Sequence, residues 1–216
     1  MKRFIQMGAM ILSLNFLAGA PVQAEDAATR VDYVTLAAPQ PTSDPSKIEV
    51  VEMFSYGCSH CYHLDPLLDT WVSAQPEDVV FVRIPVVFRE SWEPLARAYY
   101  VSEMLGVSDK THTALFKAVH EDKQRIEDID ALAKFFVAQG VDDKKFRDAY
   151  NSFGVAAKIN RAKQMTQRYG ITGTPTLVIN GKYRTSASEA GSHEGMLKAA
   201  NKLIEQERAT LKTAAP

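Results

Sequence analysis

The chain has only two cysteines, Cys58 and Cys61, which stand three positions apart with Ser59 and His60 between them. A disulfide between them would close a loop so short that it restricts the unfolded chain little, so a structural staple is the weaker interpretation. The thiolate form of cysteine is the nucleophile of thiol–disulfide exchange and also a metal ligand. The spacing therefore indicates redox chemistry or metal binding.

The cysteine pair falls where a strand pattern gives way to a helical pattern. Residues 48–54 are mostly apolar, residues 55–57 are typical of a turn, and the apolar residues of 58–74 recur at helical spacing. The unpaired N–H groups and partial positive charge at a helix N-terminus stabilise a thiolate. We therefore expect Cys58 to lie exposed at the helix start with a lowered pKa, and Cys61 to lie shielded one turn further on.

His60 stands inside the pair and can carry a positive charge or donate a hydrogen bond beside the Cys58 sulfur. Either interaction favours the reduced, charged state. Each ~1.4 kcal/mol of such stabilisation makes the disulfide a stronger oxidant by about 30 mV. Cys58 would then form the mixed disulfide with a substrate, and Cys61 would resolve it.

Metal binding is the main chemical alternative. Zinc could use Cys58 and Cys61 with His63, but a structural zinc site needs four ligands and the other histidines show no motif spacing. Covalent haem attachment needs a histidine directly after the second cysteine, where this chain has Tyr62. Zinc and a structural disulfide stay open as weaker alternatives, and we expect no cofactor and no metal.

The N-terminal residues 1–24 have the three parts of a secretory signal. A basic start precedes a mostly apolar stretch at 4–20, and Val-Gln-Ala at 22–24 offers the small residues of a cleavage site. A membrane anchor is the alternative, but Gln6 and Asn15 interrupt the apolar stretch, and a span needs about 20 predominantly apolar residues. We therefore expect a cleaved signal peptide and an exported protein.

Composition excludes one class of function. Without the signal, 23 basic and 26 acidic residues remain, so the charge is nearly balanced and does not indicate an electrostatic nucleic-acid binder. Hydrophobic residues make up 46% of the chain, which is ample for a core at this length. The length fits one domain, or one domain with an insertion.

Apolar patterns predict strands and helices in the order strand, strand, helix, strand, helical block, hairpin, helix. The expected strands cover residues 31–36, 48–54, 79–87, 176–179 and 182–185, and Asn180-Gly181 gives the last two a hairpin turn. The expected helices cover residues 58–74, 95–105, 110–119, 129–137, 144–150, 155–169 and 196–208. This order predicts an α/β sheet covered on its faces, with a helical block inserted between two halves of the sheet.

Two segments of the chain carry a resemblance to a known family. The runs EMFSYGCSHCY at residues 52–62 and GTPTLVINGKY at residues 173–183 resemble segments of the DsbA family of thiol:disulfide interchange proteins, in the thioredoxin superfamily. The mature length, the export signal and the helical block between the two runs match as well. The resemblance therefore covers essentially all of residues 25–210.

The resemblance implies a thioredoxin fold, which is a central mixed sheet flanked by helices, with an inserted helical domain. The implied division of the chain is a signal peptide at 1–24, a thioredoxin-like domain at 25–91 and 170–210, and an inserted helical domain at 92–169.

The resemblance also implies roles for the residues of the first run. Cys58 is the nucleophile, Cys61 is the resolving thiol, the two form a redox-active disulfide, and His60 stabilises the thiolate. Glu52 matches a carboxylate buried beneath the active site, where it could move protons to and from Cys61. The alternative for Glu52 is an exposed strand end, since glutamate is rarely buried unpaired.

In the second run, Pro175 matches a cis-proline that faces the cysteines and turns the backbone of Thr174 toward an extended substrate chain. A cis X–Pro bond is an uncommon feature and usually a deliberate one. The alternative is an ordinary trans proline that opens a strand.

The activity implied is the oxidation of newly exported proteins with free thiols in the periplasm, by a monomer that a quinone-linked membrane protein, DsbB, reoxidises. Two departures leave the oxidising strength open: Ser59 replaces a proline of the best-known members, and Thr174 replaces a valine that is common in oxidising members. The competing functions are a periplasmic disulfide isomerase or reductase, and a peptide-binding chaperone without redox activity.

Overall fold

The computed structural model describes residues 31–214, so the expected signal peptide lies outside the described residues. The strands are β1 (Val34–Thr35), β2 (Ile48–Phe54), β3 (Val79–Pro85), β4 (Thr176–Ile179) and β5 (Tyr183–Thr185). The helices are α1 (Ser59–Ser73), η1 (Glu90–Trp92), α2 (Glu93–Leu105), α3 (Ser108–His120), α4 (Ile129–Ala138), α5 (Asp143–Tyr150), α6 (Phe153–Arg168), α7 (Ala187–Ala190) and α8 (His193–Ala214). Within this part of the chain, no helix is long and apolar enough to cross a membrane.

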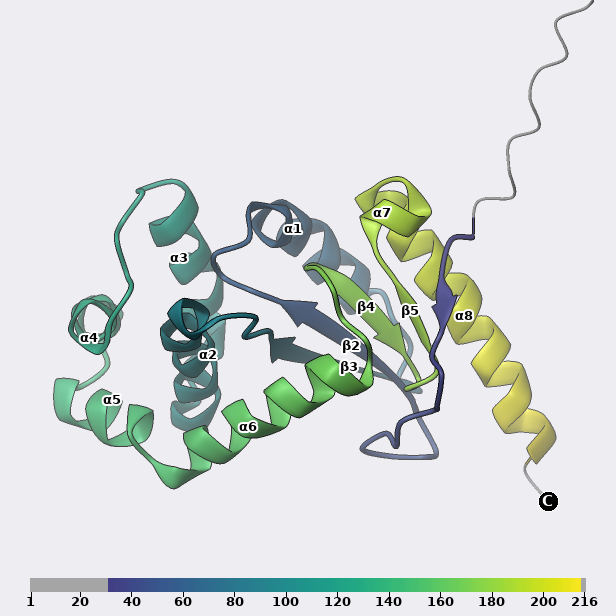
Figure 1. Ribbon diagram of the computed structural model, residues 1–216, viewed down its shortest axis with the longest axis horizontal. Coiled ribbons are helices and arrows are strands. Elements are labelled where there is room, and N and C mark those ends of the chain that lie inside the picture. The colour runs from purple at the N-terminus through teal and green to yellow at the C-terminus, as the bar shows by residue number, and fades with distance from the viewer. Residues whose placement is uncertain (1–30, 215–216) are drawn as a thin grey trace, which may run out of the picture.

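The five strands form one mixed sheet in the order β1-β5-β4-β2-β3. β2 pairs in parallel with β3 and antiparallel with β4, and the other pairs are antiparallel. All seven residues of β2 are buried, as expected for a central strand covered on both faces. The mixed sheet flanked by helices confirms the thioredoxin-type α/β fold expected from the sequence (Figure 1).

Each face of the sheet has its own apolar core, because side chains of a strand point alternately to opposite faces. α1 and α8 cover one face, where the buried side chains are Ile48, Val50, Leu64, Leu68, Trp71, Leu177, Ile179, Met196, Ala200, Leu203 and Ile204. α6 ends over the other face, where the buried side chains are Val51, Met53, Val86, Met165, Tyr169, Ile171 and Val178. The two cores together hold β2 in a fixed orientation relative to α1, which follows it in the chain.

Five helices, α2 to α6, follow one another between β3 and β4. α2 to α5 gather beside the sheet, on the left in Figure 1, around a third core that reaches the active-site segment through Phe54, Tyr56 and Cys61. The inserted helical block is therefore present. Its boundaries at residues 92 and 169 stay a prediction.

The observed bounds differ from the expected ones at several elements, and three of these differences have a local cause. β1 has two residues rather than six, because it pairs only with Tyr183 and Arg184 of β5. β3 ends at Pro85 rather than at residue 87, because its partner β2 ends at Phe54, opposite Pro85. α8 is longer than the expected 196–208, since the Ser192 hydroxyl caps it by accepting the Gly195 N–H at 3.0 Å.

Two short helices, η1 and α7, were absent from the expected elements. Neither reaches two turns, so neither repeats its apolar positions often enough to produce a helical pattern. α7 begins after Ser186, whose side chain accepts the N–H of Glu189.

The expected hairpin turn is present between β4 and β5. Asn180 and Gly181 have positive φ values of 49° and 61°, and the Lys182 N–H donates to the Ile179 carbonyl at 3.0 Å. This is the geometry that an Asn-Gly pair favours. Gly181 also packs against the segment before β2, because the Gln40 N–H donates to its carbonyl at 2.8 Å.

We predict that Gly181→Ala destabilises the fold by about 3 kcal/mol, since a β-carbon there adds a clash to the cost of a left-handed residue. That β-carbon would lie 2.1 Å from the Gln40 carbonyl oxygen. Gly106→Ala is the matched control, because Gly106 has a similar φ of 66° and open space around it. Its cost should be about 1 kcal/mol. Equal losses in urea unfolding would contradict the role of the Gln40 contact.

Candidate active site

Cys58 is the N-cap residue of α1, directly after the turn that follows β2. Its backbone is extended, with φ −93° and ψ 116°, and its N–H donates to the Ser55 carbonyl at 3.0 Å. The sulfur of Cys58 accepts the N–H of Cys61 at 3.4 Å, so a side chain that begins the helix also satisfies one of its free donors. The expected position at the helix start is confirmed.

These contacts lower the pKa of Cys58 from its usual range to about 5. The hydrogen bond with the Cys61 side chain lowers this pKa most, and the Thr174 side chain and the backbone N–H groups of Cys61 and His60 lower it further. Partial burial of the sulfur acts in the opposite direction. Most Cys58 side chains are therefore thiolates at neutral pH.

Cys61 is in the opposite environment. It is fully buried in the core shared by α1 and the inserted helices. Burial, and then the hydrogen bond to Cys58, raise the pKa of Cys61 well above its usual range, and the nearby negative charge of Glu52 adds to the effect. At neutral pH, one sulfur is charged and accessible, and the other is protonated and shielded.

The loop before β4 faces the cysteines. The Thr174–Pro175 peptide bond is cis, so the alternative of an ordinary trans proline does not hold. The carbonyl oxygen of Thr174 lies 3.3 Å from the Cys58 sulfur. The two sequence runs, 116 residues apart, therefore meet at the reactive sulfur.

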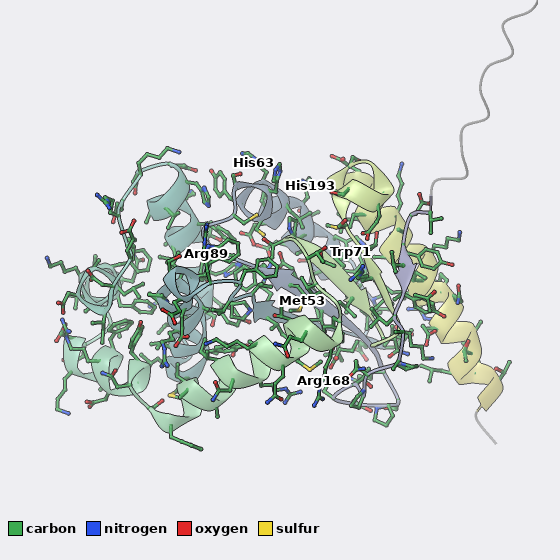
Figure 2. All side chains as sticks on the ribbon, in the orientation of Figure 1. Met53, His63, Trp71, Arg89, Arg168 and His193 are labelled. Atoms are coloured by element: carbon green, nitrogen blue, oxygen red, sulfur yellow. The ribbon has the colours of Figure 1, made fainter. Side chains whose placement is uncertain are left out.

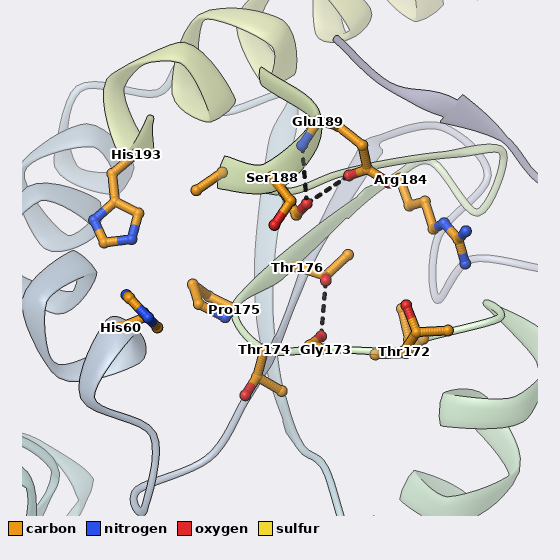
Figure 3. A pocket seen from close by; sticks show the side chains of 13 residues that line it. His60, Thr172, Gly173, Thr174, Pro175, Thr176, Arg184, Ser188, Glu189 and His193 are labelled. Carbon is orange, nitrogen blue, oxygen red and sulfur yellow. Dashed lines mark hydrogen bonds between the residues drawn. The ribbon is translucent and has the colours of Figure 1, made fainter. Parts of the chain in front are cut away.

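A cavity of about 420 Å³ opens beside this loop. Figure 3 shows His60 and His193 on one side of it, Pro175 and Ser188 in the middle, and Arg184 on the opposite side. The rings of His60 and His193 meet edge to face, with centroids 6.4 Å apart. The His60 ring thus faces the cavity, while its backbone N–H is the part that stabilises the Cys58 sulfur.

Glu52 is buried, with 1% of its surface exposed, which excludes the alternative of an exposed strand end. Its carboxylate accepts a hydrogen bond from Arg83 Nε at 2.9 Å. Burial raises the pKa of Glu52 to about 7, against the attraction of Arg83. Near neutral pH this carboxyl group can therefore both accept and release a proton.

The polar partners of Glu52 are not evident from the sequence pattern around it. Arg83 also contacts Asp65 at 3.3 Å and Asp69 at 2.7 Å, and His112 Nε2 lies 3.0 Å from Asp65. One signal was present: Arg83 is a charged residue inside the apolar run 79–87. A charge at such a position needs a buried partner.

His63 and His193 lie at the end of the molecule where α1 begins (Figure 2). Within residues 31–214, no three His, Cys, Asp or Glu side chains come together as a metal site.

The site combines two sulfurs with opposite protonation, a cis-proline loop and a buried acid. Together with the fold, these features define a dithiol–disulfide oxidoreductase of the thioredoxin class.

Comparison with known proteins agrees with this class. The family model of the DSBA-like thioredoxin domain matches residues 49–199. The thiol:disulfide interchange protein DsbA of Pseudomonas aeruginosa is 41% identical over 202 residues, which is 94% of this chain and 96% of that protein. The DsbA of Burkholderia cepacia is 39% identical over 203 residues, covering 93% and 95%. The chain belongs to the DsbA family of thiol:disulfide oxidoreductases.

Solved structures agree as well. The crystal structure of Pseudomonas aeruginosa DsbA is 42% identical and superposes with a TM-score of 0.81 over 84% of this chain and 94% of that chain. The oxidoreductase NmDsbA3 from Neisseria meningitidis is 35% identical, with a TM-score of 0.73 over 84% and 97%.

We predict that iodoacetamide at pH 5.5 alkylates Cys58 of the reduced protein much faster than Cys61. The reason is that pH 5.5 lies above the Cys58 pKa of about 5, whereas the pKa of Cys61 is raised. Mass mapping after a brief reaction measures both sites. Labelling of Cys61 at an equal or greater rate would overturn the assignment of the two sulfurs.

A second prediction concerns Thr174, whose side chain lowers the pKa of Cys58. Thr174→Val removes the hydroxyl group and keeps the shape, so we expect the pKa of Cys58 to rise by about one unit. Thr174→Ser keeps the hydroxyl group and serves as the control. Thiolate absorbance at 240 nm against pH measures both variants. A valine variant that titrates like the serine variant would show that the backbone donors act alone.

Proposed function

We propose that this protein is a periplasmic oxidant that donates the Cys58–Cys61 disulfide to exported proteins with free thiols. The observation that carries this proposal is the position of the Cys58 sulfur at the N-terminus of α1, where its contacts with Cys61 lower its pKa to about 5. The donors responsible act on a sulfur that is charged only in the reduced protein, so they favour reduction of the disulfide. A disulfide that is easily reduced is a strong oxidant.

In the proposed reaction, a substrate thiolate attacks the Cys58 sulfur of the oxidised protein. The Cys58–Cys61 bond breaks, a mixed disulfide forms, and the Cys61 sulfur takes up a proton. A second substrate thiolate then attacks the substrate sulfur of the mixed disulfide, and Cys58 leaves as a thiolate. The substrate loses two electrons and the protein gains them. The low Cys58 pKa makes its sulfur a good leaving group.

Glu52 is proposed to supply and accept the Cys61 proton. A pKa of about 7 suits a group that must exchange protons near neutral pH. Burial of both groups keeps bulk water from doing this directly, since Glu52 is 1% exposed and Cys61 is fully buried. The raised pKa of Cys61 means that its sulfur takes up a proton when the disulfide breaks.

Thr174 and Pro175 are proposed to hold the substrate chain beside Cys58. The Thr174 carbonyl contacts the sulfur, and the cavity behind Pro175 gives room for a substrate side chain. His60 is proposed to stabilise the thiolate through its backbone N–H, while its ring lines the cavity beside the cis-proline loop.

The remaining parts of the proposal come from the family. The relatives are named thiol:disulfide interchange proteins, which supports exported protein substrates and a DsbB-like, quinone-linked membrane reoxidant. The sequence pattern of a signal peptide at residues 1–24 supports the periplasmic location. We also propose that the protein acts as a monomer and that residues 92–169 form the inserted domain.

The second candidate function is a disulfide isomerase or reductase. The observation that favours it is Thr174, because threonine at this position also occurs in isomerase and reductase relatives. The two functions differ in the equilibrium with glutathione, since a reductase holds its disulfide far more strongly than an oxidant does.

We predict that the reduced protein is more stable than the oxidised protein at pH 7. The disulfide loop is too short to stabilise much, whereas the Cys58 thiolate loses its donors on unfolding. A Cys58 pKa of about 5 sets an upper bound of about 2.7 kcal/mol at pH 7, and solvent screening of this part-exposed group reduces the expectation to about 1–2 kcal/mol.

Proton binding determines how the stability difference between the reduced and oxidised forms changes with pH. A lowered folded-state pKa contributes all of its stability above the unfolded pKa and loses it as pH falls through about 5. The stability difference should therefore shrink between pH 7 and pH 4, as urea melts of both forms would measure. A glutathione titration is the companion measurement. An oxidised form that is the more stable at pH 7 would assign the protein to the reductases.

A further inference from the structure

Helix α3 holds the active-site loop through Tyr56, the second residue before Cys58. The Tyr56 hydroxyl group is 2.7 Å from His112 Nδ1, and the Tyr56 carbonyl oxygen is 2.7 Å from His120 Nε2. The Phe116 ring packs edge to face against the Tyr56 ring, with their centroids 4.9 Å apart. These three α3 residues are four positions apart, so they share one helix face. The inserted helices therefore contact the redox site directly.

His112 is in two hydrogen bonds at once. Its Nε2 lies 3.0 Å from an Asp65 carboxylate oxygen, which can only accept when ionised. Nε2 therefore carries the proton that it donates to Asp65, and Nδ1 is the ring nitrogen that shares a hydrogen bond with the Tyr56 hydroxyl group. His112 and Asp65 are 8% and 4% exposed, so few water molecules compete for these bonds.

The hydrogen-bonded chain continues from Asp65 to the buried acid of the site. The same Asp65 oxygen accepts from Arg83 at 3.3 Å, and Arg83 Nε donates to Glu52 at 2.9 Å. Tyr56, His112, Asp65, Arg83 and Glu52 thus form one continuous path, from the loop through α3, α1 and β3 to β2.

One guanidinium group serves three carboxylates on this path, because Arg83 also donates to Asp69 at 2.7 Å. The Nε2–H of His112 supplies one of the hydrogen bonds that the buried Asp65 carboxylate accepts. Without it, a buried carboxylate would draw Arg83 toward itself and away from Glu52, since an ionised group without donors is costly in a buried site.

We propose that His112 is a positioning residue for the redox centre. By donating a hydrogen bond to Asp65, His112 keeps the Arg83 guanidinium group hydrogen-bonded to Glu52. This proposal rests on the proposed proton transfer between Glu52 and Cys61. It adds that a residue of the inserted helices maintains the hydrogen bond between Arg83 and Glu52 on which that transfer depends. The titratable groups that face Glu52 are Arg83, Asp65, Asp69, Cys61 and Tyr56, and those that face His112 are Asp65, Tyr56 and Tyr99.

Two variants of His112 separate its two hydrogen bonds. In His112→Gln the side-chain amide reaches the Nε2 position and keeps the donor to Asp65. In His112→Asn the amide reaches only the Nδ1 position, so the bond to Tyr56 is kept and the bond to Asp65 is lost. Tyr56→Phe is the matched control, because it removes the bond to His112 and keeps the ring in its aromatic pocket.

The readout is the Glu52 carboxyl titration, followed by ¹³C NMR of the reduced full-length protein, with Glu52→Gln used to assign the signal. We expect His112→Asn to move the titration midpoint of Glu52 upward by about one pH unit. His112→Gln and Tyr56→Phe should leave the midpoint within a few tenths of a unit. A role in folding alone would change stability without this pattern. An unshifted midpoint in His112→Asn, or an equal shift in Tyr56→Phe, would overturn the proposal.

The rate at which a substrate thiol opens the Cys58–Cys61 disulfide, measured against pH, gives a second readout, because Cys61 takes up its proton in this step. His112→Asn should shift this profile to higher pH by the same amount as the carboxyl titration. A profile that is unchanged in Glu52→Gln would refute proton transfer by Glu52. The carboxyl titration of Glu52 would still test the positioning of Arg83 by His112. Failure of the proposed proton transfer can therefore be distinguished from failure of the proposed positioning role.

Discussion

The contact of Cys61 with the Cys58 sulfur, through its side chain and through its N–H at 3.4 Å, is the interaction on which the chemistry of this protein depends. It exists because β2 ends in the protein interior and the chain turns directly into α1, whose first turn has free N–H groups. The two cores on the faces of the sheet pack against β2 and α1 and hold the sulfur beside its donors.

The same helical turn gives the two sulfurs opposite properties. Three residues of helix carry the chain from the partly exposed surface at Cys58 into a fully buried position at Cys61. Hydrogen-bond donors dominate at the first position and lower the pKa, while burial dominates at the second and raises it. A single turn thus yields a good leaving group and a sulfur that must exchange a proton. The buried carboxyl group of Glu52 is matched to the second requirement, with a pKa of about 7.

Much of this arrangement could be predicted from sequence, because its determinants are local. The strand-to-helix boundary fixed the positions of Cys58 and Cys61, and the Asn180-Gly181 turn fixed the hairpin. The partners of Glu52 could not be predicted, because Arg83, Asp65 and His112 meet only after β3 and α3 have packed against α1. The orientation of the His60 ring toward His193 depends likewise on α8, more than 130 positions away. Local periodicity carries no information on such contacts.

These nonlocal contacts bear on the meaning of the inserted helices. An insertion that served only to shield the site would need apolar contact with it, as Phe116 provides against the Tyr56 ring. α3 adds two histidines that bond the loop at both ends of Tyr56, and one of them joins the polar path to Glu52. Buried hydrogen bonds of this kind fix geometry more strictly than apolar packing does, because a misplaced buried donor or acceptor is costly. The insertion therefore contributes buried hydrogen bonds as well as apolar packing to the active-site loop, and changes in its packing should affect the sulfurs as well as stability.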